Sequence, residues 1–165
     1  MTAKPQIDTV EAAPDPDWLG EVHPDIVTVY RYWREKAAGR VMPARADIDP
    51  ADLVRYLPSL MLVDVVPGAE RPHYTYRLVG TREVAVRGSD PTGKPVATHC
   101  FGRSAADAFE NYDRVVASRA PRIDRAHLLS FDAMILDGDK LFLPLSGDGL
   151  HVDMILVFTV QEKLR

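Results

Sequence analysis

Aromatic side chains recur at two places where regular structure would bring them to a common surface. Residues 73–79 alternate between polar and apolar types, which is typical of a β-strand and puts Tyr74, Tyr76 and Leu78 on one face. Phe109 and Tyr112 belong to an apolar stripe at helical spacing. These two faces are expected to meet, either as plain core or as the wall of a small ligand cavity. In the second case the tyrosine hydroxyls would contact the ligand, with further polar contacts from Arg77 and His127.

Arg45, Asp47 and Arg77 form a second candidate group. They could make an ion-pair lock between a linker and the sheet. The functional alternative is an anchor for a carboxylate ligand, because the planar guanidinium group of arginine binds carboxylates with two parallel hydrogen bonds.

Residues 88–94 (GSDPTGK) have the spacing of a phosphate-binding loop, G-x-x-x-x-G-K. The next position should carry a hydroxyl for Mg²⁺, yet it is Pro95, and the following residues are a poor helix. The segment is therefore interpreted as a structured turn, with Asp90 and Thr92 bonded to nearby backbone groups.

Metal and nucleophile chemistry have little support in the sequence. His99 and Cys100 are adjacent, and no other histidine or cysteine stands at a ligand spacing that would complete a metal or haem site. No G-x-S-x-G motif is present. Asp137, Asp139 and Asp148 fail the calcium-loop pattern and are interpreted as turn residues. We therefore expect no metal, no cofactor and no catalytic residues.

Composition limits the class of protein further. The chain has 165 residues, a net charge of −4 and a single cysteine. This suits one domain (21–165) preceded by a flexible arm (1–20), with no basic surface for nucleic acid. No apolar run approaches the ~20 residues of a membrane span, so we expect a cytoplasmic protein without a membrane partner.

The elements that must position these residues follow from periodicity and turn signals. A helix is predicted over 24–38, a short helix after Asp49-Pro50, and a longer helix from 105 to before Pro121. Residues 80–103 are predicted as loops and small helical turns. Strands are predicted over 60–66, 73–79, 123–131, 140–145 and 152–160, with a turn at 137–139. Pro144 suggests a bulge or an edge position, and the last strand is apolar on both faces and should be central.

This order predicts an α+β domain: a five-stranded antiparallel sheet with helices on one face and a flanking N-terminal helix. Four segments strengthen the prediction: residues 39–53 (GRVMPARADIDPADL), 76–81 (YRLVGT), 88–94 (GSDPTGK) and 142–153 (FLPLSGDGLHVD). Together they resemble a family of stand-alone PAS domains from alphaproteobacteria, over residues 24 to 160.

The resemblance implies a non-catalytic sensory or regulatory domain that binds a small molecule, a protein partner, or both. We expect a homodimer formed through the helix at 24–38 and a sheet face. Two alternatives stay open: a small acid–base enzyme on the same scaffold, with Asp132 or His127 as the base, and an adaptor whose interior is filled by side chains.

Overall fold

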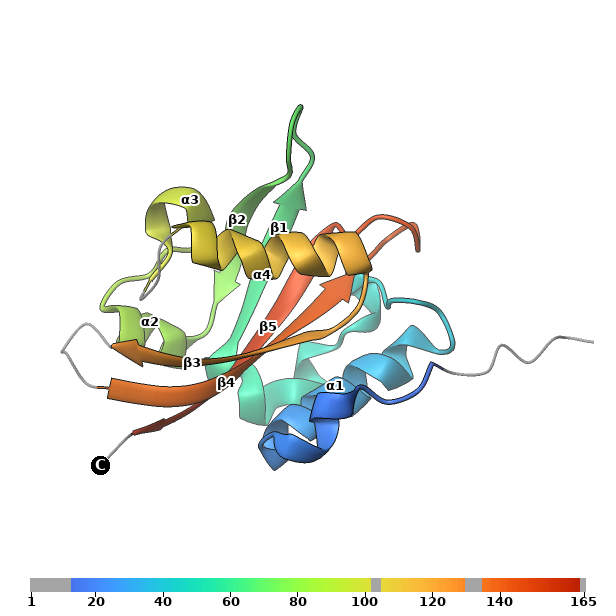
Figure 1. Cartoon of the computed structure of the whole chain (residues 1–165), viewed down its shortest axis with the longest axis horizontal. Helices are drawn as coiled ribbons and strands as arrows, with labels where there is room; N and C mark the ends of the chain where they lie inside the picture. The colour runs from blue at the N-terminus through green and yellow to red at the C-terminus, as the bar shows by residue number, and fades with distance from the viewer. Residues whose placement is uncertain (1–12, 102–104, 130–134, 164–165) are drawn as a thin grey trace, which may run out of the picture.

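The computed structural model describes residues 13–101, 105–129 and 135–163 (Figure 1). Its centre is one antiparallel sheet with the strand order β2-β1-β5-β4-β3. The strands are β1 (Leu60–Val66), β2 (His73–Val79), β3 (Arg122–Leu129), β4 (Ile135–Leu145) and β5 (Met154–Lys163). The α+β fold with a five-stranded antiparallel sheet is confirmed. So is the central position of the last strand, which pairs with both β1 and β4.

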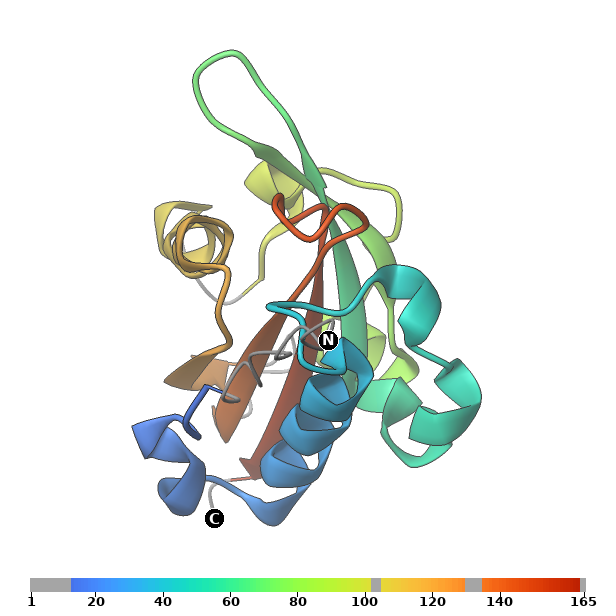
Figure 2. The same ribbon diagram turned by 90° about the vertical axis from the view of Figure 1, so that its right-hand side faces the viewer.

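Helical segments cover both faces of this sheet. The helical section between β2 and β3 contains α2 (Thr81–Arg87), α3 (Val96–His99) and α4 (Ala105–Ser118), and α4 crosses what we call the inner face. The predicted flanking helix is α1 (Pro24–Ala37); with the 3-10 helix η3 (Pro50–Ser59) it covers the outer face. Figure 2 shows α4 and η3 on opposite sides of the sheet.

Ring contacts show which strand residues point to which face. Phe142 of β4 contacts Tyr112 of α4, and Phe158 of β5 contacts Tyr56 of η3. In the β4–β5 register Phe142 lies opposite Val157, the residue before Phe158. Because successive side chains alternate between faces, Phe142 and Phe158 must point to opposite sides of the sheet.

Helix α1 forms because apolar residues recur at helical spacing, and it packs against β4 and β5. Its buried stripe is Ile26, Val29, Tyr30, Trp33 and Ala37. The indole Nε1 of Trp33 donates to the carbonyl oxygen of Pro144 at 2.8 Å inside the core. The helix ends where Ala38 adopts a left-handed conformation (φ 51°), and Gly39 after it is left-handed too. Two further 3-10 helices, η1 (Asp17–Glu21) and η2 (Arg45–Asp47), flank α1 in the chain.

The predicted turn at Asp137–Asp139 is wrong. These residues lie within β4 and pair on one side with β3 and on the other with β5. Two neighbouring ladders provide hydrogen-bond partners for this backbone, which overrides the local turn preference of the Asp-Gly-Asp sequence. Pro144 is tolerated in β4 because β3 begins opposite Phe142, so Pro144 pairs with β5 alone.

A β-bulge changes the faces of β2. Val63 lies opposite Tyr76 and Leu62 opposite Leu78, so Arg77 is an extra residue in the pairing of β1 with β2. The extra residue puts Leu78 on the opposite face from Tyr74 and Tyr76. The prediction that all three share one face is therefore wrong for Leu78, which is 47% exposed.

Candidate functional site

The predicted aromatic residues meet on the inner face, between β2 and α4. The ring of Tyr74 lies 5.0 Å from that of Tyr112 and 5.8 Å from that of Phe109. Tyr112 also makes an edge contact with Phe142 of β4 at 5.5 Å. Tyr76 is buried on the same face, two residues along β2 from Tyr74. Strand alternation in β2 and the helical repeat of α4 thus bring together four of the six predicted site residues.

The hydroxyl of Tyr74 is held by a charged network at the surface end of this cluster. It donates to Oδ1 of Asp113, whose other oxygen accepts from Nη2 of Arg71 at 2.8 Å. Burial, followed by the hydrogen bond to Asp113, raises the pKa of Tyr74 far above its ordinary value. Tyr74 is therefore a neutral donor already engaged within the chain, and it serves the site as part of a wall.

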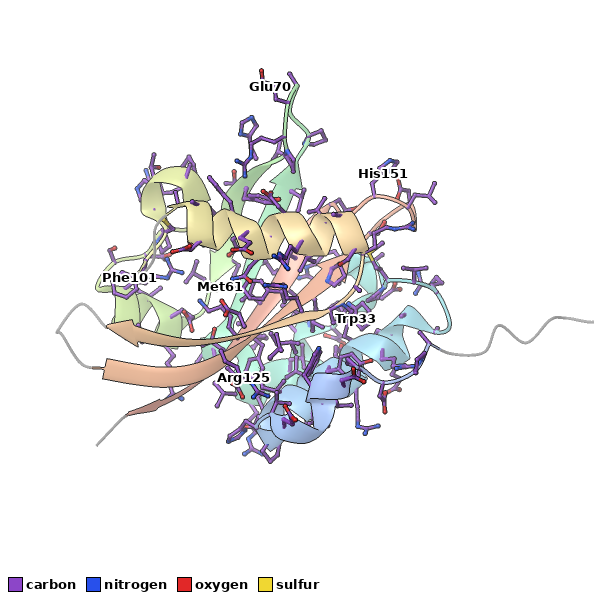
Figure 3. The ribbon with its side chains drawn as sticks, viewed as in Figure 1. Trp33, Met61, Glu70, Phe101, Arg125 and His151 are labelled. Carbon is purple, nitrogen blue, oxygen red and sulfur yellow. The ribbon has the colours of Figure 1, made fainter. Side chains whose placement is uncertain are left out.

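Arg87 brings a positive charge to the other end of the cluster. It is the last residue of α2, followed by Gly88 in a left-handed conformation that ends the helix. Its Nη1 lies 3.3 Å from the hydroxyl of Tyr76, and its Nη2 lies 3.6 Å from Sδ of Met61 in β1. The guanidinium group also stands over the ring of Tyr76, 5.0 Å from its centre. Figure 3 shows Met61 toward the α2 end of the sheet and Phe101 beside α2.

Two buried polar atoms have no hydrogen-bond partner among the described residues: Nε of Arg87 and Oγ1 of Thr159. Thr159 is 4% exposed and lies in β5, two residues beyond Val157. Val157 is the register partner of Met61, so Thr159 is a same-face diagonal neighbour of the residue that Arg87 contacts. Buried polar groups are almost always paired in proteins. The two orphaned atoms therefore mark one region of the inner face, beside Met61, where hydrogen-bonding capacity is left unused.

Burial and nearby charges shift the pKa values of the tyrosines next to this region. Burial is the largest cause that raises the pKa of Tyr76, and Arg87 opposes it. Burial also raises the pKa of Tyr112, with smaller effects from Tyr76, Arg87 and Glu83. Glu83 lies in α2 and is only 3% exposed. The inner-face site, defined here as Met61, Tyr76, Glu83, Arg87, Tyr112 and Thr159, thus combines both signs of charge with aromatic walls.

Sequence reasoning missed Met61, Glu83, Arg87 and Thr159. Glu83 and Arg87 are four residues apart in α2, a spacing that shares one helix face. That spacing is visible in the sequence, but the Gly, Pro and Thr content of residues 80–103 favours loops and small turns. Thr159 lies in a strand with the apolar pattern of a core strand. Whether its hydroxyl has a hydrogen-bond partner cannot be inferred from the residue type.

The structure separates Arg77 from the aromatic cluster. Its Nε donates to Oδ2 of Asp64 at 2.8 Å, and the side chain lines a groove on the outer face. His127 lies in β3 opposite Asp137, and its side chain is outside the described residues, as is Asp132.

The ion-pair lock predicted for Arg45, Asp47 and Arg77 is wrong. Asp47 pairs instead with Nη2 of Arg40 at 2.8 Å and accepts from the backbone of Ala44. Arg77 pairs with Asp64 because the β-bulge places it beside β1.

The segment that resembled a phosphate loop is the structured turn that was predicted. Oδ1 of Asp90 accepts from both the backbone N–H and the hydroxyl of Thr92. Within the described residues, no group of three or more His, Cys, Asp or Glu side chains could hold a metal ion. Nor does any helix in the described ranges have the length and apolarity to cross a membrane.

This sheet order, with helices on the inner face and a flanking helix on the outer face, defines a class of α+β domain, and comparison with known proteins identifies that class. A family profile described as PAS domain matches residues 22–157, which is most of the chain. The chain therefore belongs to the PAS domain family. A search of curated proteins finds no match.

Solved structures resemble this chain at low sequence identity. A light-oxygen-voltage domain studied with a flavin analogue is 12% identical with a TM-score of 0.50, over 68% of this chain and 83% of that one. A sensory box sensor histidine kinase from Vibrio cholerae is 17% identical with a TM-score of 0.48, over 70% and 90%. A structure of RsLOV is 16% identical with a TM-score of 0.48, over 65% of this chain and 61% of that one, so this chain spans under two thirds of its length.

Proposed function

We propose that this PAS domain is a sensor that binds a small molecule at the inner-face site and signals its occupancy to a protein partner. The observation that carries the proposal is the pair of orphaned buried atoms, Nε of Arg87 and Oγ1 of Thr159. A buried polar atom without a hydrogen-bond partner costs free energy. A ligand that supplies an acceptor to Arg87 and a polar partner to Thr159 would remove this cost at both atoms.

The surrounding residues favour a ligand with a flat or apolar body and a polar end. Tyr112 and Met61 are buried and provide the apolar surface, and Tyr74 and Phe109 extend this surface through their ring contacts. Arg87 is the cation at the polar end; its Nη1 donates to the hydroxyl of Tyr76 and to the carbonyl oxygen of His99, and its Nη2 contacts Sδ of Met61. The ligand therefore needs an acceptor atom directed at the Nε edge of this guanidinium group.

Signal transfer would follow from the position of α2 and α3. Helix α2 contributes Glu83 and Arg87, contacts η3, and is followed in the chain by α3, which packs against α4. A ligand that orders Arg87 would therefore stabilise α2 and the contacts it makes with η3. These segments are the ones through which occupancy would reach a partner protein.

The proposal is tested by thermal unfolding of the purified chain with and without a small-molecule cell extract. We expect the extract to raise the unfolding midpoint of the wild-type chain, because a ligand that binds only the folded state stabilises it. Thr159→Val keeps the shape of the side chain and removes the hydroxyl, so its midpoint should not respond.

Thr28→Val is the matched control, because Thr28 is exposed on α1 and lies outside the site. It should respond to the extract as the wild type does. An equal response of Thr159→Val, or no response of the wild type, would rule out this site as the sensor.

A homodimer is a further part of the proposal, and the structure limits its geometry. The apolar stripe of α1 is buried against its own sheet. A dimer built through α1 would therefore use the outward face of that helix, which carries Thr28, Arg31 and Glu35.

A further inference from the structure

A hollow lies on the outer face of the sheet, away from the inner-face site. This outer-face groove has a volume of about 1000 Å³ and runs between η2–η3 on one side and β2 on the other. Its floor is the outer face of β1 and β5, where Leu60, Leu62 and Leu156 point. Small-molecule sites commonly have volumes of roughly 300–1,000 Å³, so the groove is large enough for a drug-sized or longer ligand.

The lining of the groove is aliphatic and contains no aromatic residue. Its walls expose two large apolar side chains: Val54 of η3 is 63% exposed and Leu78 of β2 is 47% exposed. Protein-binding surfaces are enriched in Tyr, Trp and Phe at their centres, and flat aromatic ligands are usually stacked on rings. A lining of leucine, valine, isoleucine and methionine suits an alkyl chain better than either of these occupants.

Two arginines, Arg45 and Arg77, line the groove, and backbone contacts place both at the same end. Arg77 pairs with Asp64, which lies opposite Met154 at the start of β5. Arg45 lies two residues after Pro43, whose carbonyl oxygen accepts from the N–H of Ser146. Ser146 directly follows the last residue of β4, which lies opposite Met154. The other end of the groove is formed by Pro58, Val79 and Gly80. The groove is therefore basic at one end and apolar at the other.

The charges at the basic end leave a net positive site. Asp64 engages Arg77 through Nε, and among the described contacts this leaves the Nη donors of Arg77 for another acceptor. Arg45 donates through Nη1 to the carbonyl oxygen of Ile48, a neutral partner. Two guanidinium groups thus face one carboxylate.

We propose that the outer-face groove binds a single-chain amphiphile, an alkyl chain with a terminal carboxylate, with the carboxylate at Arg45 and Arg77 and the chain along Leu62, Leu156 and Leu78. The inference is independent of the inner-face site, because the two sites lie on opposite faces of the sheet. It assigns the domain a second ligand class.

The test is a fluorescence titration of the purified full chain with cis-parinaric acid, a naturally fluorescent chain carboxylate, below its micelle concentration. We expect saturable binding of one molecule per chain, displaced by dodecanoate and far less by methyl dodecanoate or dodecyltrimethylammonium. Each methylene removed from the competing carboxylate should weaken its binding about fourfold, because each carries the burial free energy of one CH₂.

Three variants separate binding in the groove from non-specific binding of amphiphiles. Val54→Glu puts a charge into the groove wall and should weaken binding at least about tenfold. Val41→Glu is the matched control, because Val41 is a 56% exposed valine outside the groove lining. Arg77→Gln should weaken carboxylate binding about tenfold and leave the ester unchanged.

Several results would overturn the proposal: no saturable binding, equal loss in the two valine variants, or equal affinity for the carboxylate and the trimethylammonium amphiphile. If instead the chain self-associates and Val54→Glu alone abolishes that association without any amphiphile binding, the groove is a protein interface and the proposal is wrong. Thr159→Val should bind the probe as the wild type does. A loss of ligand binding at the inner-face site can therefore be distinguished from a loss of probe binding in the outer-face groove.

Discussion

Thr159 and Arg87 each keep a polar atom buried and unpaired on the inner face of the sheet. Such a group carries a desolvation penalty of about 1–3 kcal/mol in the empty protein. The two penalties fall within one region, next to Met61, and the proposed ligand would relieve both. A domain that serves only as a packed scaffold would gain stability by replacing these groups with apolar ones.

Thr159→Val therefore gives a direct prediction at this scale. In the empty protein the substitution should raise the free energy of unfolding by about 1 kcal/mol, because the buried hydroxyl is removed at nearly constant volume. Urea denaturation followed by circular dichroism measures the difference. A loss of stability would mean that the hydroxyl is paired in the folded chain.

The buried tyrosines predict a stability that depends on alkaline pH. Burial raises the pKa of Tyr74, Tyr76 and Tyr112 above the ordinary value of 10.0. Folding therefore favours the neutral phenols. Their contribution is complete below about pH 10, where the unfolded chain also keeps them neutral, and it is lost as the pH rises above that value.

An ultraviolet titration of the wild type against Tyr112→Phe isolates one of these groups. The difference between the two curves should show Tyr112 ionising only above pH 10, together with unfolding. Ionisation of Tyr112 at or below its ordinary pKa in the folded protein would contradict its burial. Tyr112→Phe also keeps the ring contacts with Tyr74 and Phe142, so the fold is preserved.

At the scale of elements, the junction between η3 and α2 depends on one glycine. Gly80 caps the start of α2 and donates its N–H to the carbonyl oxygen of Leu60 at 2.8 Å. A Cβ at this position would lie 2.4 Å from the carbonyl oxygen of Pro58, a backbone atom that has little freedom to move. This close approach connects the outer-face groove to the helix that carries Arg87.

Gly80→Ala should therefore destabilise the fold by about 1–3 kcal/mol. Gly20→Ala is the matched control, because a Cβ there meets nothing within 4 Å and the backbone is not left-handed. Thermal unfolding of both variants beside the wild type makes the comparison. Equal midpoints for the two alanine variants would show that η3 and α2 are not tightly packed.

Most elements could be predicted because each has a strong local signal. Strands β1 and β2 were predicted with their observed ends, and α1 was predicted to within one residue. The failures have non-local causes. The Asp137–Asp139 turn is overridden by two flanking ladders, and the face of Leu78 depends on a bulge that needs the partner strand to exist.

The site was partly predictable for the same reason. Strand alternation and helix period identified Tyr74, Tyr76, Phe109 and Tyr112 as neighbours, and ring contacts confirm the Tyr74–Phe109–Tyr112 cluster. The position of Arg87 depends on how α2 packs against β1 and β2, and the unpaired state of Thr159 depends on every atom around it. Neither property is encoded in a local pattern.

At the scale of the whole molecule, one sheet separates two candidate binding regions. The inner face is aromatic and contains buried charge, and the outer-face groove is aliphatic and basic at one end. Helix α2 carries Glu83 and Arg87 of the inner-face site, η3 lines the outer-face groove, and these two elements contact each other. The ligands proposed for the two faces would therefore influence one another through this pair of elements, and a measured coupling would have to be reciprocal.

The homodimer gives a prediction at this scale. If α1 forms the interface through its outward face, Arg31→Glu should lower the apparent mass of the particle by half in light scattering coupled to gel filtration. The reason is that a charge reversal on a polar, two-fold interface places like charges together. Arg119→Glu, on the loop after α4, is a control of equal charge change. A strict monomer at high concentration, before any substitution, would exclude the dimer.

The central claim, a ligand at the inner-face site, is tested most directly by native mass spectrometry of the purified chain after incubation with a small-molecule cell extract. We expect one added mass per chain, released on denaturation, and absent from Arg87→Met and Thr159→Val. An unmodified mass for the wild type, or an added mass that both variants retain, would contradict it.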